Sequence, residues 1–400
     1  MSQMIMIRDL VESVRDEVIE WRRYFHKYPE LSFQEEKTAQ FVYETLQTFG
    51  ELEISRPTKT SVMARLIGQL PGKVIALRAD MDALPIEEEN DFDFVSQNLG
   101  VMHACGHDGH TAMLLGAAKL LTQLKEHIKG EIRFLFQHAE ELFPGGAQEM
   151  VKAGVMDGVD QVIGIHLCSP IEVGKFGVCH GPATSGSDTF DIKIQGKGGH
   201  SSEPHATVDP IAVGSQVISN LQHIVSRNRD PLEKLVVSVT KFYSGTAYNV
   251  IPDTATLSGS IRSLNPELRK QLPSTMKRIV KGVTEAHDAS FELDYHFGYS
   301  SVVNDDRVRE VIEKTIMDVW GEDSLLNLPA LMSGEDFSAF SDEVPGCFIF
   351  VGAGNQNKGI IYPHHHPRFS IDEDALEIGV ELFVQSSFRL LEEPGNKNAE

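Results

Sequence analysis

Residues 103–124 read HACGHDGHTAMLLGAAKLLTQL, and the rest of the chain is organised around this stretch. Its first eight residues hold three histidines, a cysteine and an aspartate, and thiolate with imidazole suits zinc and related divalent metals. Apolar side chains at helical spacing follow over residues 111–124, so the cluster lies at a predicted helix N-terminus, which would lower the pKa of the Cys105 thiol. A glycine-containing turn with packed or solvated side chains is the alternative, but metal ligands come in sets.

The bulk composition indicates a soluble globular protein and excludes two classes of partner. The chain has 400 residues, of which 41% are hydrophobic and 24% charged, enough for two domains. Its net charge of −22 argues against nucleic acid and against an anionic membrane surface, since both need a basic face.

The N-terminus and the cysteines indicate a reducing compartment. Residues 1–18 lack a basic region followed by an unbroken apolar run, so no signal peptide is predicted. The four cysteines, at positions 105, 168, 179 and 347, show no paired spacing. We therefore expect reduced thiols and a cytoplasmic protein.

Helices and strands alternate through the first half of the chain. Apolar spacing predicts a helix over residues 7–25, and Ser32 with Glu35 is typical of a capping box that opens a second helix. Residues 61–67 and 73–79 are expected to form a pair of strands around a Gly-Gln-Leu-Pro-Gly turn. This alternation predicts an α/β fold with a mixed, mostly parallel sheet flanked by helices.

Polar residues gather where the predicted strands end. Asp80 and Asp82 follow the strand at 73–79 and would share one face, Glu140 and Glu141 follow an apolar strand at 131–136, and His166 follows a strand at 161–165. In parallel sheets, ligands bind beyond the carboxyl ends of the strands. We expect these side chains to converge on one site, although each pair taken alone could be a turn cap or a solvated surface.

The middle of the chain has a different order of predicted strands and helices, which indicates an inserted domain. Its elements follow the β-α-β-β-α-β order of a ferredoxin-like unit: strand 189–196, helix 210–226, strands 235–243 and 255–263, helix 266–287 and strand 290–298. The predicted domains are therefore a catalytic domain in two parts, residues 1–184 and 301–400, and an inserted lid or dimerisation domain, residues 185–300.

The candidate metal ligands are Cys105, His107, Glu141, His166 and one of His364, His365 or His366. Five donors exceed the need of one closed tetrahedral site and suit two metals that share a bridging water. Such a site makes a bound hydroxide near neutral pH and polarises a carbonyl. The neighbouring Glu140 would then shuttle a proton as general base and acid.

Several motifs, in order, resemble those of the metallopeptidase-20 amidohydrolases, and most closely the aminoacylases, hippurate hydrolases and plant auxin-conjugate hydrolases. The motifs are MHACGHDGHTAMLLGAA, FQHAEE with PGGA, GIHL, GKGGHSSEPH, GTAYNVIPD, SGEDF and HHPRF, spread from Leu77 to Phe369. The resemblance implies a two-metal catalytic domain, an inserted lid that often mediates dimerisation, and hydrolysis of the amide of an N-acyl amino acid or a related small conjugate.

The resemblance also implies roles for individual residues. Its metal ligands fall on Cys105, His107, Glu141, His166 and His365; its proton shuttle falls on Glu140, its oxyanion-steadying lid histidine on His200, its substrate-carboxylate contacts on Asn249 and Arg262, and its supporting aspartates on Asp80, Asp82 and Asp108. The expected cofactors are two divalent ions, with zinc, manganese, cobalt and nickel all compatible with these donors. The expected partners are a small-molecule substrate and further copies of the chain, as a homodimer or a higher homo-oligomer through the lid domain.

Some points stay open at the level of the sequence. His138 stands where the family commonly has proline, and it would either crowd the metals or be an idle surface imidazole, which we favour. The run of three histidines makes the last ligand ambiguous by one residue. A dipeptidase or carboxypeptidase on the same scaffold is the main alternative activity, and a non-catalytic metal-dependent binding protein is a more distant one.

Overall fold

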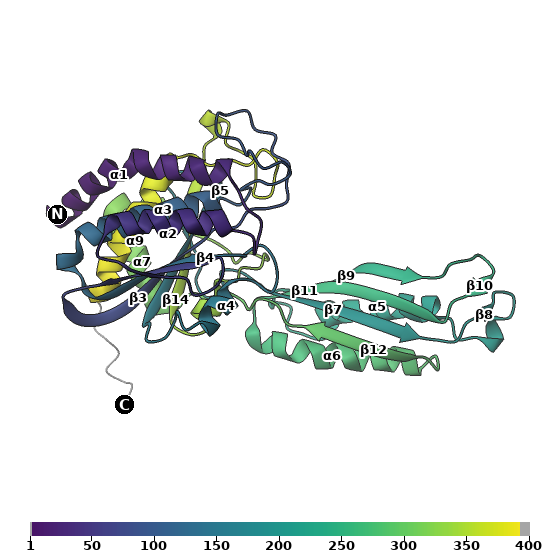
Figure 1. Ribbon diagram of the computed structural model, residues 1–400. Coiled ribbons are helices and arrows are strands. Elements are labelled where there is room, and N and C mark those ends of the chain that lie inside the picture. Colours follow the sequence, from purple (N-terminus) through teal and green to yellow (C-terminus); the bar gives the residue numbers. More distant parts are fainter. Residues whose placement is uncertain (1, 393–400) are drawn as a thin grey trace. The chain divides into compact units, whose positions relative to one another are not determined.

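The computed structural model describes residues 2–392, and the chain divides into two compact units (Figure 1). The larger unit comprises Met1–Ala183, Val303–Pro329 and Asp336–Glu400, and the smaller unit comprises Thr184–Val302 and Ala330–Glu335. Residues 330–335 thus belong to the smaller unit and not to the second part of the catalytic domain, residues 301–400, that the sequence predicts.

The larger unit is built on an eight-stranded sheet in the order β1-β2-β4-β3-β5-β14-β6-β13. The strands are β1 (Glu53–Ser55), β2 (Val62–Ile67), β3 (Leu70–Asp80), β4 (Lys129–Gln137), β5 (Gln161–Glu172), β6 (Phe176–Val178), β13 (Leu325–Asn327) and β14 (Gly346–Gly354). The central neighbours β4, β3, β5 and β14 run parallel, and so do β6 and β13. The pairs β1–β2, β2–β4 and β14–β6 are antiparallel. The predicted mixed, mostly parallel sheet is confirmed.

The predicted pairing of the strands at 61–67 and 73–79 is wrong, because β4 lies between β2 and β3. The glycines between these two strands allow the backbone to pass close to that of the segment at the start of β4. Gly68 donates its N–H to the carbonyl of Gly130 at 2.8 Å, and a Cβ on Gly68 would lie 2.2 Å from the carbonyl oxygen of Ile128. The start of β4 therefore inserts where a hairpin was expected.

The helices of the larger unit pack against this sheet and against one another. They are α1 (Ser2–Lys27), α2 (Glu36–Phe49), α3 (His107–Gln123), α4 (Ala147–Lys152), α7 (Asp306–Trp320), α8 (Ser338–Ser341) and α9 (Asp374–Glu392), with short 3-10 turns at Lys125–His127, Glu322–Ser324 and Gln356–Lys358. Helices α2, α3, α9 and α7 are successive neighbours, and α1 packs on α3 and α9 (Figure 1). Within residues 2–392, every helix is too short or too polar to span a lipid bilayer.

The predicted capping box at Ser32 and Glu35 is also wrong. Helix α2 begins at Glu36, and the N-cap residue that precedes it, Glu35, makes no side-chain capping bond. Ser32 donates instead to the carboxylate of Asp82 at 2.7 Å, and Glu35 accepts from the backbone N–H of Ala139 at 2.8 Å. Both side chains are used for contacts with segments distant in the chain.

The smaller unit has a four-stranded antiparallel sheet in the order β12-β7-β11-β9. Its strands are β7 (Gly186–Gln195), β9 (Leu235–Ser244), β11 (Thr254–Ser263) and β12 (Ser290–His296), its helices are α5 (Pro210–Arg227) and α6 (Pro266–Glu285), and β8 (Gly199–His200) pairs with β10 (Val250–Ile251) beside the 3-10 turn Pro204–Ala206. Asp209 and Asn265 cap α5 and α6 with their side chains. Alternate residues of β7 and β11 are buried, as expected for a sheet with one covered face.

Candidate active site

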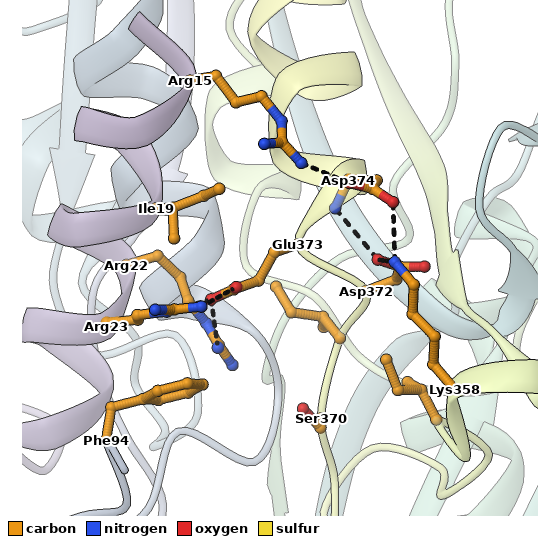
Figure 2. Close-up of a pocket in the computed structure, with 12 residues that line it drawn as sticks. Arg15, Ile19, Arg22, Arg23, Phe94, Lys358, Ser370, Asp372, Glu373 and Asp374 are labelled. Atoms are coloured by element: carbon orange, nitrogen blue, oxygen red, sulfur yellow. Dashed lines mark hydrogen bonds and ion pairs between the residues drawn. The ribbon is translucent and has the colours of Figure 1, made fainter. Parts of the chain in front are cut away.

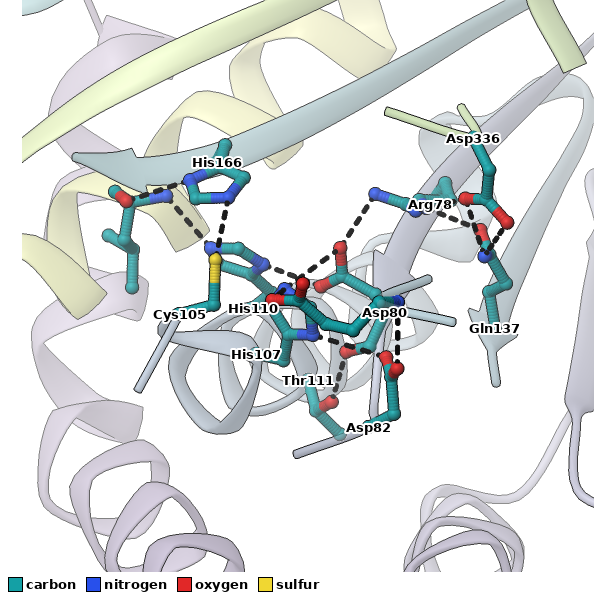
Figure 3. Close-up of polar contacts among 12 residues, drawn as sticks. Arg78, Asp80, Asp82, Cys105, His107, His110, Thr111, Gln137, His166 and Asp336 are labelled. Atoms are coloured by element: carbon teal, nitrogen blue, oxygen red, sulfur yellow. Dashed lines mark hydrogen bonds and ion pairs between the residues drawn. The ribbon is translucent and has the colours of Figure 1, made fainter. Parts of the chain in front are cut away.

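The five predicted metal ligands come together in two overlapping groups in the larger unit. The ligand atoms of Cys105, His107 and His166 lie within 4.8 Å of one another, and so do those of Cys105, Glu141 and His365. Cys105 is shared between them, and Figure 3 shows its sulfur facing the His166 ring, with Sγ 3.6 Å from Nε2. The ligand atoms of Glu140, His107 and Glu141 also form a group within 4.8 Å.

Hydrogen bonds fix which nitrogen of two imidazoles faces this cluster. His166 Nδ1 lies 2.8 Å from the carbonyl of Leu167, which only accepts, so Nδ1 carries the proton and Nε2 is left as a lone pair beside Cys105. His107 Nδ1 lies 3.2 Å from Asp82, while its buried Nε2 has no hydrogen-bond partner among the described residues. Both rings therefore present Nε2 as a metal ligand would.

The three consecutive histidines lie in different environments. His365 Nε2 lies 3.1 Å from Glu141, and its backbone N–H donates to Ala104 at 2.8 Å. His364 points its Nε2 at the carbonyl of Leu167 at 2.9 Å, and the His366 ring stacks on Tyr362 at 4.5 Å. Of the three, His365 is the one that lies in a described group of potential ligands.

The electrostatics of the cluster favour a bound cation. Burial alone lowers the pKa of His107, but Asp80, Asp82 and Glu141 outweigh it and raise that pKa to about 10. The predicted lowering of the Cys105 pKa is wrong: burial and then the neighbouring carboxylates Glu141 and Glu140 raise it well above its usual value. Cys105 precedes α3 by two residues, so carboxylates and burial dominate over the helix N-terminus.

The donor set fits divalent metal ions. It combines a thiol, imidazole nitrogens and a carboxylate, the mixture that zinc and neighbouring transition metals accept. The unpartnered Nε2 of His107 is buried inside a ring of acids, where leaving it without a ligand would cost free energy. Two groups that share Cys105 also provide each of two ions with protein donors while leaving open positions.

Two of the three predicted supporting aspartates touch the ligands. Asp82 accepts from the backbone N–H of Glu141 at 3.0 Å as well as facing His107, and Asp80 lies 3.6 Å from His107 Nε2. Asp108 turns toward α1 instead, where it pairs with Arg22 and His26, each at 2.8 Å. The assignment of Asp108 as a support for the ligands is therefore wrong; it ties the start of α3 to α1.

His110 was not assigned a role from the sequence, but it orients the site. Its Nδ1 lies 2.6 Å from Asp80, and its Nε2 accepts the backbone N–H of Leu167 at 2.8 Å, which uses both ring nitrogens (Figure 3). His110 therefore fixes Asp80 and the strand that carries His166. Its spacing of three residues from His107 on α3 was the available signal.

A buried network behind Asp80 was also missed. Arg78 donates to Asp80 at 2.8 Å, to Gln137 at 2.7 Å and to Asp336 at 3.0 Å (Figure 3). Asp336 further accepts from Gln137, and burial raises its pKa to about 6 although Arg78 opposes this. The network joins the ends of β3 and β4 to the turn that precedes α8.

The segment before Glu140 is conformationally strained. Ala139 has a φ of +51°, a left-handed conformation that costs a residue with a Cβ about 1–2 kcal/mol. Its N–H is held by Glu35, which is fully buried. Burial, followed by repulsion from Asp82, raises the pKa of Glu35 to about 7.

His138 is buried, so its interpretation as a surface imidazole is wrong. Its Nε2 lies 3.1 Å from Glu149, its Nδ1 lies 3.4 Å from the Thr58 hydroxyl, and its ring packs on Phe33 at 5.6 Å. The ring is therefore directed at Glu149 of α4 and at Thr58 and Phe33, rather than at the ligand cluster.

A separate cavity of about 350 Å³ lies between α1 and the segment that precedes α9 (Figure 2). Its charged groups are already paired: Arg23 with Glu373, Arg15 with Asp374, and Lys358 with Asp372 and Asp374. The cavity thus presents balanced ion pairs rather than an unmatched charge for a ligand.

The predicted site residues of the smaller unit do not all lie together. His200 pairs in register with Val250, next to Asn249, and its ring contacts Ser202 at 2.7 Å. Arg262 lies near the other end of β11, opposite Ser187, whereas the β11 end near this loop is Thr254, opposite Gln195. Eight residues of strand span roughly 27 Å, so Asn249 and Arg262 of one copy do not meet on one small carboxylate.

Comparisons with known proteins agree with this geometry. The model of peptidase family M20/M25/M40 matches residues 76–387. An N-acyl-L-amino acid amidohydrolase of Geobacillus stearothermophilus is 66% identical over 75% of this chain and 81% of its own, and thermostable carboxypeptidase 1 of Saccharolobus solfataricus is 42% identical over 93% and 95%. The solved structure of the YXEP protein of Bacillus subtilis, described as a dinuclear metal binding peptidase of the M20 family, is 35% identical with a TM-score of 0.85 over 95% and 99% of the two chains. The chain belongs to peptidase family M20/M25/M40.

Proposed function

We propose that the protein hydrolyses the amide bond of N-acyl amino acids. The observation that carries this proposal is the pair of ligand groups sharing Cys105, with Glu140 in a further group beside His107 and Glu141. The similarity to an N-acyl-L-amino acid amidohydrolase at 66% identity supports the same substrate class.

In this proposal Cys105, His107, Glu141, His166 and His365 hold two divalent ions. When bound, such ions polarise the acyl carbonyl and lower the pKa of a water. Glu140 removes a proton from the attacking water as its oxygen bonds to the carbonyl carbon. Glu140 then delivers that proton to the amide nitrogen as the carbon–nitrogen bond breaks, which yields a carboxylic acid and a free amine. Transfer of the acid proton to the amine gives the carboxylate and ammonium forms that prevail at neutral pH.

The smaller unit contributes the remaining groups. His200 donates to the oxyanion that develops on the acyl oxygen, a stabilisation typically worth several kcal/mol. Arg262 and Asn249 bind the substrate carboxylate. Because Asn249 lies beyond the Thr254 end of β11 and Arg262 lies near its other end, we propose that His200 and Asn249 of the partner subunit act together with Arg262. The protein is then a homodimer through its lid, and it is cytoplasmic.

A carboxypeptidase activity is the second candidate, favoured by the similarity to a thermostable carboxypeptidase at 42% identity. Both activities need a carboxylate on the amino acid that leaves. They differ in whether the group on the other side of the amide is a simple acyl chain or an amino acid with a free or blocked amine.

The test is hydrolysis by protein stripped of metal and reloaded separately with zinc, manganese, cobalt or nickel. The panel comprises N-acetyl amino acids, hippurate, dipeptides and N-blocked dipeptides. The proposal predicts that N-acyl amino acids are hydrolysed fastest with at least one metal and that stripped protein is inactive. Faster hydrolysis of dipeptides across all metals would favour the carboxypeptidase, and metal-independent activity would contradict the two-ion account.

A further inference from the structure

The turn before α2 is docked against the segment that carries Glu140. Glu35 Oε1 accepts the backbone N–H of Ala139 at 2.8 Å and that of Phe33 at 3.0 Å. Both donors have left-handed backbones, with φ of +51° at Ala139 and +65° at Phe33. A single buried oxygen thus fixes two conformations that residues with a Cβ rarely adopt.

The backbone of Glu140 is held from both sides by buried carboxylates. On one side Glu35 binds the N–H of Ala139, and on the other Asp82 binds the N–H of Glu141 at 3.0 Å. Asp82 is itself fixed by the hydroxyl of Ser32 in the same turn, at 2.7 Å. The direction in which the Glu140 side chain leaves the backbone is set between these two hydrogen bonds.

We propose that Glu35 is a positioning residue for amide hydrolysis, because its carboxyl oxygen holds Ala139 in the left-handed conformation from which Glu140 reaches the reacting water. The inference rests on the proposed function of Glu140. Without the acceptor, the left-handed Ala139 relaxes toward a common conformation, and the peptide that joins it to Glu140 rotates.

An ordinary role in helix capping does not account for these contacts. Glu35 precedes α2 but makes no side-chain bond to that helix, and its partner Ala139 lies 104 residues away in the chain. Either protonation state of Glu35 retains an oxygen that accepts an N–H, so the role depends on the reach of the side chain and not on its charge.

Two substitutions separate reach from charge. Glu35→Gln keeps a carbonyl oxygen at the same distance along the side chain and removes the charge. Glu35→Asp keeps the charge and withdraws the oxygen by one methylene. Glu35→Leu removes the acceptor altogether, and Glu36→Gln, at the exposed neighbouring position paired with Lys59, is the matched control.

Steady-state kinetics on the fastest substrate of the panel, with metal content and melting temperature measured on each variant, give the first readout. Glu35→Asp and Glu35→Leu should lose about tenfold or more in kcat with little change in KM, because misplacing a catalytic group slows the chemical step. Glu35→Gln and Glu36→Gln should stay within about threefold of wild type, a rescue that a purely charge-based role would not give. Equal kcat in Glu35→Asp and wild type, or equal losses in Glu35→Asp and Glu35→Gln, would overturn the proposal.

Crystal structures of Glu35→Asp and Glu35→Gln give a second readout that does not depend on activity. The proposal predicts that φ of Ala139 stays positive in Glu35→Gln and leaves the left-handed region in Glu35→Asp. An unchanged Ala139 in Glu35→Asp would refute the positioning role. If wild-type protein hydrolyses nothing in the panel, the proposed function fails, whereas these structures still decide whether Glu35 holds the segment.

Discussion

Glu140 and Glu141 are adjacent carboxylates whose surroundings divide their roles. Glu141 lies 3.1 Å from His365 and shares a ligand group with Cys105, so it faces the cation-binding cluster directly. Glu140 is buried and lies in a group with His107 and Glu141, but not in either of the two groups that contain Cys105. This arrangement suits one residue that binds metal and one that moves a proton.

The first prediction concerns Glu140→Gln. The amide keeps the shape of the side chain but cannot accept the water proton, so kcat should fall by about 10²–10⁴-fold. Metal content, measured by elemental analysis, should stay at the wild-type value because Glu141 remains. Loss of metal together with activity would instead assign Glu140 to the ligand set.

The second prediction concerns acid stability at a residue remote from the site. Glu131 pairs with Arg65 and Arg133 at 2.7 Å, and hydrogen bonding to Arg65, opposed by burial, lowers its pKa. Since the folded pKa lies below the unfolded value of about 4.3, this stabilisation is complete above roughly pH 5 and is lost as the pH falls through the folded pKa. Glu131→Gln should cost about 2 kcal/mol at pH 7 and progressively less below pH 4.

Calorimetric unfolding between pH 3 and 7 checks this prediction. The matched control is Glu53→Gln, which removes the exposed partner of the same Arg65 and should cost less than about 1 kcal/mol at any pH. A constant difference between Glu131→Gln and wild type over this range would show that the pKa of Glu131 is not lowered by folding.

The sequence could predict only those site residues whose partners are neighbours in the chain. The cluster at 103–110 and the Glu-Glu pair are readable because their members are neighbours in the chain. The role of Glu35 was not readable, since its partner Ala139 is brought to it only by the fold. The pKa of Cys105 was misjudged for the same reason: Glu140, Glu141 and Asp80 come from other segments.

Among the helices and strands, α3, which begins with His107, is buried along most of its length between its neighbours in the larger unit. All of its residues from His107 to Thr122 except Lys119 are buried. A Cβ on its glycines would meet neighbouring side chains directly. A Cβ on Gly116 would lie 2.7 Å from Val18 of α1 and 2.9 Å from Val380 of α9. The close packing of three helices therefore depends on this glycine.

The third prediction follows from this packing. Gly116→Ala should lower the free energy of unfolding by about 1 kcal/mol or more, because overpacking outweighs the higher helix propensity of alanine. In α6, a Cβ on Gly282 meets nothing within 4 Å, so Gly282→Ala should raise stability by about 0.5–1 kcal/mol. Calorimetry of both variants is the check, and stabilisation by Gly116→Ala would contradict the packing described.

Most elements were predictable because periodicity and capping residues mark them. The helices of the smaller unit begin with Asp209-Pro210 and Asn265-Pro266, where a capping side chain precedes a proline. The order of strands in the larger sheet was not predictable from adjacent segments. The local sequence at 68–72 is equally compatible with a tight hairpin and with the observed arrangement. In that arrangement β4 lies between β2 and β3, and the glycines allow its backbone to approach closely.

At the scale of the whole molecule, the smaller unit separates groups that one substrate would need together. His200 and Asn249 lie at the β8–β10 pair, beyond the Thr254 end of β11, and Arg262 lies near the other end of that strand. A homodimer resolves this separation if His200 and Asn249 of the partner subunit complete each site. The family resemblance identifies these three residues from the sequence, but it does not give the distances between them in the folded chain.

The fourth prediction tests this dimer by complementation. Glu140→Gln and His200→Ala should each be nearly inactive alone. After refolding or subunit exchange of an equal mixture, half of the dimers are mixed and each mixed dimer has one intact site of two, so about a quarter of wild-type activity should return. No recovery, with mixed dimers verified by differential tagging, would place His200 in the site of its own chain.

The proposed hydrolysis depends on two cations held by five side chains from distant segments of the chain. Anomalous diffraction from crystals of zinc-loaded protein tests this most directly. We predict two peaks about 3.5–4 Å apart, bounded by the donor atoms of Cys105, His107, Glu141, His166 and His365, with Glu140 alongside. A single peak, or peaks whose ligands exclude Cys105 and His166, would contradict the account.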